Sequence, residues 1–213
     1  MSEETEYKGY IIKIEPDDDL PSPREDDNLG AMVCWHSRYD LGDKHDFCNT
    51  DVFMLGEEYL EDTPEDFELY TEHVPVIVLP LYLYDHGGIT ISTGREYPFN
   101  DRWDAGQVGY IYVTLEKVRK EYGWKLITHA RRKKIEEYLR NEVHAYAQYL
   151  TGDIYGYNIL DKDSESLDSC WGFYGEKECL EEAKSIVDHT IQKVHEELLE
   201  ALLNPYDAAP TFA

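Results

Sequence analysis

The chain has 213 residues, and its 45 Asp and Glu outnumber its 20 Lys and Arg, which gives a formal net charge of −25. This excess argues against direct binding to nucleic acids or to anionic membranes, because proteins bind both through Lys and Arg. Aromatic residues make up 13% of the chain, which argues against a disordered acidic protein. No apolar run approaches the roughly 18 residues of a membrane span, and the acidic start of the chain lacks a signal-peptide pattern. We therefore expect a cytoplasmic protein with reduced thiols.

The first part of the chain predicts short strands separated by polar loops. Residues 6–15, EYKGYIIKIE, predict a strand that ends at a proline. Residues 16–28 are rich in Pro, Asp and Glu and predict an exposed loop. Residues 31–36 are short and apolar, and we expect them to form a buried strand.

The middle of the chain predicts a short helix and then a hairpin. Residues 63–72 begin with Thr-Pro-Glu-Asp, which is typical of a helix start because the threonine caps and the acids favour the positive end of the helix dipole. Residues 74–86 and 89–93 are rich in β-branched and aromatic side chains, and the glycines between them predict a tight turn. Pro75 and Pro80 in the first strand indicate an edge strand or a bulge.

The remaining elements follow in the second half of the chain. Apolar residues at helical spacing predict the longer helices. We expect strands over 108–114, 154–160 and 169–175, and helices over 115–123, 128–150 and 177–203. Because few strands are followed by a crossover helix, the pattern predicts an α+β fold, with a mainly antiparallel sheet and two long helices packed against it. We expect a single domain over residues 1–213 with an acidic N-terminal third, residues 1–73.

The acidic N-terminal third is the main functional clue. It carries 22 Asp or Glu and five Lys or Arg, and the charge of the whole chain exceeds the roughly 2 to 8 units that keep a small domain soluble. Dense carboxylates on a rigid frame can occupy a DNA-binding groove and exclude DNA. The alternative is that they only confer solubility. The predicted binding surface comprises Asp17, Asp18, Asp19, Glu25, Asp26, Asp27, Glu57, Glu58, Glu61, Asp62, Glu65 and Asp66.

Residues 117–140 form a basic run with nine Lys or Arg. This run could bind a nucleic acid, or it could be a solvated helix face that pairs with acids of the same protein. We favour the second interpretation, because the net negative field would repel a polyanion.

Histidines and carboxylates near residue 40 raise the alternative of a metal site. Imidazole and carboxylate ligands suit zinc or manganese, but these residues lie on a predicted loop and lack the spacing of a helical zinc motif. The candidate ligands are His36, Asp40, His45 and Asp46. A small metal-dependent hydrolase that uses His36, Asp40, His45 and His86 is therefore the alternative to a binding function.

Other catalytic patterns are weak. Asp85 and His86 are adjacent at a strand end, where they would point to opposite faces, so a plain hairpin turn is favoured over a general base. Cys170 lies in an apolar strand, and we expect a buried, inert thiol there and no nucleophile at Cys34. The sequence contains no nucleotide-binding or serine-hydrolase motif. We predict no catalytic residue and no cofactor, and favour a protein that is not an enzyme.

Three segments together resemble a family of small acidic proteins that bacteriophages and mobile elements encode. The segments are DNLGAMVCWHSRYDLGD at 27–43, LYLYDHGGITIS with DRWDAGQVGYIYV at 81–113, and YLTGDIYGYNI with DSCWGFYG at 149–175. The family has no assigned activity, so the resemblance implies no catalytic residues, and Trp103, Gln107 and Trp171 are either site or core residues.

The resemblance does imply a context, since phage accessory proteins often block host defence and some imitate DNA. We therefore expect a phage-type protein that acts in the host cytoplasm. It would inhibit a basic, nucleic-acid-binding defence protein, with DNA mimicry as the candidate mechanism. No pattern in the sequence predicts an oligomeric state.

Overall fold

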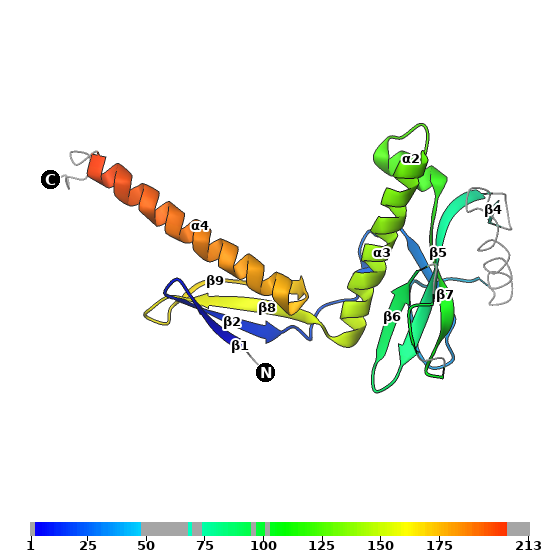
Figure 1. Ribbon diagram of the computed structural model, residues 1–213, viewed down its shortest axis with the longest axis horizontal. Helices are drawn as coiled ribbons and strands as arrows, with labels where there is room; N and C mark the ends of the chain where they lie inside the picture. Colours follow the sequence, from blue (N-terminus) through cyan, green and yellow to red (C-terminus); the bar gives the residue numbers. More distant parts are fainter. Residues whose placement is uncertain (1–2, 48–67, 70–73, 95–96, 101–102, 204–213) are drawn as a thin grey trace. The chain divides into compact units, whose positions relative to one another are not determined.

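The structure is a computed structural model that describes residues 3–47, 68–69, 74–94, 97–100 and 103–203 (Figure 1). The chain separates into two compact units. Met1–Leu20 and Gly152–Ala213 form one unit, which we call the terminal unit, and Pro21–Thr151 form the other, the central unit. The expectation of a single domain over residues 1–213 stays a prediction.

The terminal unit is a four-stranded antiparallel sheet with one long helix. In spatial order its strands are β1 (Glu3–Tyr7), β2 (Tyr10–Pro16), β8 (Ile154–Leu160) and β9 (Ser166–Tyr174), and its helix is α4 (Glu176–Leu203). Its core cluster comes from β2, β8 and one side of α4: Ile12, Ile14, Tyr157, Ile159, Cys179, Ala183 and Val187. Pairing of β2 with β8 joins the two ends of the chain, which explains why the units are not sequential.

The single strand predicted over residues 6–15 is two strands, β1 and β2. They meet at Lys8 and Gly9, whose φ angles are 52° and 86°. A two-residue hairpin turn with positive φ at both positions matches the right-handed twist of the strands, and glycine takes such an angle without strain. The prediction missed this turn because a lysine occupies its first position.

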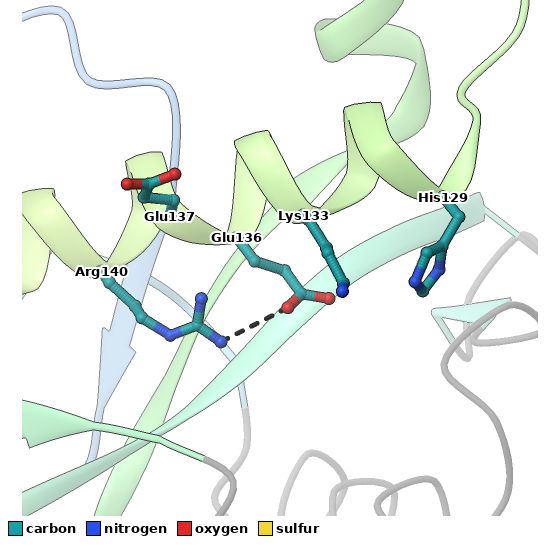
Figure 2. A pocket seen from close by; sticks show the side chains of 5 residues that line it. All are labelled: His129, Lys133, Glu136, Glu137 and Arg140. Carbon is teal, nitrogen blue, oxygen red and sulfur yellow. Dashed lines mark hydrogen bonds and ion pairs between the residues drawn. The ribbon is translucent and has the colours of Figure 1, made fainter.

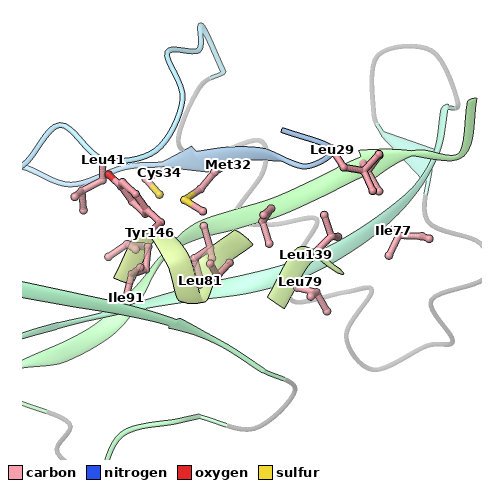
Figure 3. Packing of buried hydrophobic residues seen from close by; sticks show 14 of the residues in the cluster. Leu29, Met32, Cys34, Leu41, Ile77, Leu79, Leu81, Ile91, Leu139 and Tyr146 are labelled. Atoms are coloured by element: carbon pink, nitrogen blue, oxygen red, sulfur yellow. The ribbon is translucent and has the colours of Figure 1, made fainter. Parts of the chain in front are cut away.

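The central unit is a second antiparallel sheet covered by a second long helix. Its sheet has the order β3 (Ala31–Cys34), β7 (Ala105–Thr114), β5 (Val74–Asp85) and β4 (Glu68–Leu69), and β6 (Ile89–Thr93) also pairs with β5. A short 3-10 helix, η1 (Pro23–Glu25), precedes β3, and α2 (Leu115–Tyr122) and α3 (His129–Thr151) follow β7. Figure 3 shows how Leu139 and Tyr146 of α3 pack with Leu79, Leu81 and Met32 from the strands.

Local signals placed α2 and α3 correctly. The Thr114 hydroxyl accepts a hydrogen bond from the Lys117 backbone N–H at 3.1 Å and so caps α2. Gly123 ends this helix with a φ of 64°, in the left-handed region. Thr128 stands just before α3, where its hydroxyl lies 3.4 Å from the Arg131 nitrogen.

Pro80 lies in a central strand, since β5 pairs with β7 on one side and with β6 and β4 on the other. The edge-strand alternative holds locally, because among the described residues 76–80 of β5 pair with β7 alone, and β5 and β7 also shift register between Leu81 and Tyr82. β6 pairs only with Leu81–Asp85, so Pro80 lies just beyond the part of β5 that β6 reaches.

The α+β class and the antiparallel pairing are confirmed. The two long helices do not share one sheet, however: α3 contacts the strands of the central unit, and α4 contacts those of the terminal unit. The helix predicted over 63–72 lies outside the described residues except for Glu68 and Leu69, which form β4 and not a helix. None of the helices that the structure describes is long and apolar enough to cross a membrane.

Candidate functional site

Negative charge is concentrated in the terminal unit. This unit has 21 Asp and Glu against six Lys and Arg, a formal charge of −15, whereas the larger central unit has 24 against 14, a charge of −10. Per residue, the terminal unit is therefore more than twice as negative. The linear count over residues 1–73 missed this, because β2 and β8 bring the acidic C-terminal segment into one unit with residues 3–19.

The acids of the terminal unit lie on its surface. They occur on β1, after β2, in the turn between β8 and β9, and along the side of α4 that faces solvent. The exposed ones are Glu3, Glu4, Glu6, Asp18, Asp19, Asp163, Glu165, Glu176, Glu178, Glu181, Glu182, Asp188, Glu196, Glu197 and Glu200. A partner would thus meet carboxylates from several elements of one packed body.

The predicted acidic surface draws on residues of both units. Asp17, Asp18 and Asp19 belong to the terminal unit, whereas 25–27 belong to the central unit, next to η1. The other half of the prediction, 57–66, lies outside the described residues. The candidate surface is therefore redefined as the exposed carboxylates of the terminal unit, which retain Asp18 and Asp19 of the original set, with the half-buried Asp17 beside them.

Like charges crowd at the start of α4. The pKa of the Glu176 carboxyl is raised, first by its hydrogen bond with Glu3, then by desolvation and by the negative charges of Glu3 and Asp153. Elsewhere in the unit Lys8 lies 2.8 Å from Asp188, and the hydrogen bond from this lysine lowers the pKa of Asp188. The unit therefore neutralises some carboxylates but leaves Glu176 in a negative field.

The basic run of the central unit has internal partners. The Arg131 guanidinium lies 4.7 Å from the centre of the Trp124 ring, and Lys134 lies 6.0 Å from that of Tyr122. The Lys117 ammonium donates to the Asn28 carbonyl at 2.6 Å. These contacts favour the interpretation that the run is a structural helix face.

An open hollow of about 560 Å³ lies along α3 (Figure 2). His129, Lys133, Glu136, Glu137 and Arg140 line it, and Figure 2 shows Glu137 pointing away from the other four. Glu136 is 7% exposed, and its carboxylate accepts a hydrogen bond from the Arg140 guanidinium, with 3.3 Å between nitrogen and oxygen. Lys133 and Arg140 are offset by Glu136 and Glu137 in the lining, so the hollow is poorly suited to a polyanion.

A buried ion network fastens the loops of the central unit to α3. The Arg24 side chain is 4% exposed, and its guanidinium binds both carboxylate oxygens of Asp43 at 2.8 and 2.7 Å and Glu142 at 3.1 Å. Burial by itself lowers the pKa of Arg24, but the hydrogen bonds and charges of Asp43 and Glu142 raise it overall. The carboxylates also accept the Leu29 and Met32 backbone N–H groups at 2.7 Å each. The sequence analysis missed this network, because its members are far apart in the chain.

The metal candidates do not converge. The His36 Nδ1 accepts from the backbone N–H groups of Arg38 and Tyr39, at 3.3 Å each, and the His45 Nε2 lies 3.0 Å from the Cys34 carbonyl oxygen. Asp40 and Asp46 are exposed. Within the described ranges, no group of three or more His, Cys, Asp or Glu is arranged to hold a metal ion. The hydrolase alternative therefore lacks its site in this part of the chain.

Asp85 ends β5 and His86 begins the turn after it, and the two side chains have separate partners. Asp85 forms an ion pair with Arg38, whereas the His86 Nδ1 lies 2.7 Å from an Asp104 carboxylate oxygen. Asp104 can orient this imidazole, which borders an open hollow of about 350 Å³ between the β5–β6 turn and the end of α3. The lining of this hollow, all of it described, contains no cysteine or serine, so the pair has no nucleophile of those classes to activate.

The cysteines differ from the expectation in one respect. Burial raises the pKa of Cys34 to about 12 and that of Cys179 to about 11, which makes both thiols inert near neutral pH. Cys170 is exposed, so the prediction of a buried thiol was wrong. It lies on β9, an edge strand of the sheet, beside Trp171, which is half exposed.

Comparison with protein-family models, with curated proteins and with solved structures finds no match to this chain. The resemblance to acidic proteins of phages and mobile elements therefore stays a prediction.

Proposed function

We propose that the protein is a non-enzymatic binding protein whose terminal unit occupies the basic, nucleic-acid-binding cleft of another protein. The observation that carries this proposal is the formal charge of −15 gathered on one small sheet-and-helix body. Such a field attracts a cationic cleft over several ångströms and speeds encounter, as electrostatic steering does in other complexes.

The geometry of α4 supports a DNA-like role. Its 28 residues form a rod about 42 Å long, comparable to about 12 base pairs of duplex. Eight acids and three lysines lie along it, and its packed side against β2 and β8 holds the first half in place. The carboxylates of this packed half are held in place and lose little conformational entropy on binding, which favours occupation of a cleft that normally holds phosphates.

The partner that we propose is a host defence protein that binds nucleic acid, such as a nuclease, in the cytoplasm of an infected cell. This choice rests on the predicted phage context together with the charge. A basic cleft that binds phosphates is already suited to a polyanion. Exchanging a nucleic acid for the carboxylates of the terminal unit therefore costs such a cleft little binding free energy.

The test uses the full chain immobilised on a resin and a fraction of host proteins purified on DNA–cellulose. We expect one or more of these DNA-binding proteins to be retained, and to be released by added duplex DNA and by salt. Retention should fall steeply as the salt concentration rises, because contacts between these charged surfaces release bound counterions.

A matched pair of variants assigns the surface. Glu178→Gln, Glu181→Gln and Glu182→Gln remove three charges from α4, and should weaken retention by at least about tenfold at low salt. Glu25→Gln, Asp26→Asn and Asp27→Asn remove three charges from the central unit and should leave retention nearly unchanged. Equal losses in the two variants, or retention that neither salt nor DNA affects, would contradict the proposal.

A further inference from the structure

One end of the central unit is basic although the chain as a whole is acidic. Residues 115–134, which we call the α2–α3 corner, hold eight Lys and Arg against two Glu, a formal charge of +6. Since the central unit totals −10, the rest of that unit carries −16. Figure 1 shows α2 and the start of α3 at the same end of this unit. The exposed cations of the corner are Lys117, Arg119, Lys120, Lys125, Lys133 and Lys134.

Aromatic rings give the α2–α3 corner a packed base. The Tyr122 and Trp124 rings stack with 4.5 Å between their centroids, and Arg131 and Lys134 lie over them. Four other cations of the corner form no ion pair with any residue that the structure describes: Arg119, Lys120, Lys125 and Lys133. The corner thus presents cations on a frame that packing already holds in place, which favours docking of a second folded surface.

We propose that the α2–α3 corner binds the acidic terminal unit of a second copy of the chain. The two surfaces are complementary in charge, with +6 on the corner and −15 on the terminal unit, and every copy carries both. Among the described residues of the terminal unit, ion pairs engage Glu4, Glu181 and Asp188. Most of its exposed carboxylates therefore remain for contact with another surface.

The small extent of the corner favours a compact partner over a nucleic acid. A duplex that runs past these 20 residues meets the −16 of the rest of the central unit, which repels phosphates. The terminal unit gathers its carboxylates on one small body and can meet the corner without crossing that surface. Each copy carries −25 in total, but charges act over only about 8 Å at physiological salt, so the opposite charges in contact dominate.

The contact joins two different surfaces. A pair linked by one contact still has one free corner and one free acidic body, so the wild-type chain can form a second contact, within the pair or with a third copy. This association does not depend on the proposed function, which uses the acidic body but not the corner. The two compete, because a cationic cleft and the corner bind the same carboxylates.

The first test is the mass of the full chain in solution, measured by sedimentation at about 0.15 M salt over a range of concentrations. We expect the mass to rise above the 24.9 kDa of one chain as the concentration rises. It should return to that of one chain at about 1 M salt, where the Debye length is only about 3 Å.

The second test separates the two surfaces. The corner variant carries Arg119→Gln, Lys120→Gln, Lys125→Gln and Lys133→Gln, and the acidic-body variant carries Glu178→Gln, Glu181→Gln and Glu182→Gln. Each variant alone should associate at least about tenfold more weakly than the wild-type chain. Each keeps one intact surface, so an equimolar mixture should pair through one contact and stop at two copies.

A charge-preserving variant is the control for the corner, and it should associate like the wild-type chain. It carries Arg119→Lys, Lys120→Arg, Lys125→Arg and Lys133→Arg. Circular dichroism of each variant shows that it is folded. A wild-type chain that stays monomeric, an association that about 1 M salt leaves unchanged, or a mixture that does not pair would each overturn the proposal. A fluorescent DNA duplex that binds the wild-type chain but not the corner variant would also overturn it, because nucleic acid would then be the occupant.

Discussion

Each unit is an antiparallel sheet with one long helix packed on it, but the units differ in where their charged side chains lie. The central unit keeps some of its charges in its interior: Arg24, Asp43 and Glu142 form one network, and Glu136 is 7% exposed. The terminal unit keeps its carboxylates at the surface. The comparison teaches that net charge alone does not locate a binding surface, because what matters is which charges already have partners within the fold.

The largest expected loss of stability follows the removal of Arg24 from the central unit. Arg24→Met leaves Asp43 and Glu142 as uncompensated, largely buried carboxylates and should cost the central unit about 3 to 5 kcal/mol. Urea unfolding followed by tryptophan fluorescence reports mainly this unit, which holds three of the four tryptophans.

The matched control is Arg38→Met, which removes an ion pair whose arginine side chain is 66% exposed and should cost at most about 1 kcal/mol. Equal effects of the two substitutions would show that the buried network does not hold the central unit together.

Two glycines sharpen the comparison at the level of packing. A Cβ at Gly109 would collide with the Val33 backbone carbonyl, which cannot move without breaking the pairing of β3 with β7. A Cβ at Gly156 would collide with the Trp171 ring, which is half exposed and can swing away. We expect Gly109→Ala to cost about 3 kcal/mol or more and Gly156→Ala about 1 kcal/mol.

Thermal unfolding of the two alanine variants measures this order. Gly106→Ala is the control, since no atom lies within 4 Å of the position that its added methyl group would take. The reverse order would mean that Trp171 is fixed in its place over β8, as part of a rigid surface.

The smallest expected effect concerns Glu176. Its pKa is raised in the folded protein, so protonation favours the folded state, and the stability that this carboxyl contributes is lost as pH rises through its folded pKa. Glu176→Gln should therefore raise the melting temperature of the terminal unit slightly near neutral pH and lose this advantage in acid. Circular dichroism melts at several pH values measure the change, and Glu178→Gln serves as the control.

Local chemistry was readable from the sequence, and long-range pairing was not. Thr114 and Gly123 bound α2 through contacts within a few residues, so the limits of this helix could be predicted. The pairing of β2 with β8 joins residues that are far apart in the chain, and no local pattern encodes it. The same reason hid Asp104 as the partner of His86.

For the candidate site, too, the sequence indicated which residues matter but not where the fold places them. The excess of carboxylates was evident from composition, but its centre was placed in residues 1–73, whereas the fold gathers 3–19 with 153–200. A strand partner was needed to see this, and the acids of α4 look like an ordinary solvated helix face when they are considered alone.

Pairing of β2 with β8 also sets the order in which the protein matures on the ribosome. Roughly 140 residues separate these strands, so at about 5 to 20 residues per second β2 waits on the order of 10 s for its neighbour to emerge. The central unit is synthesised during that interval and can fold first. Interrupted translation would therefore release chains that lack the acidic body, and under the proposed function only finished molecules would bind a cationic cleft.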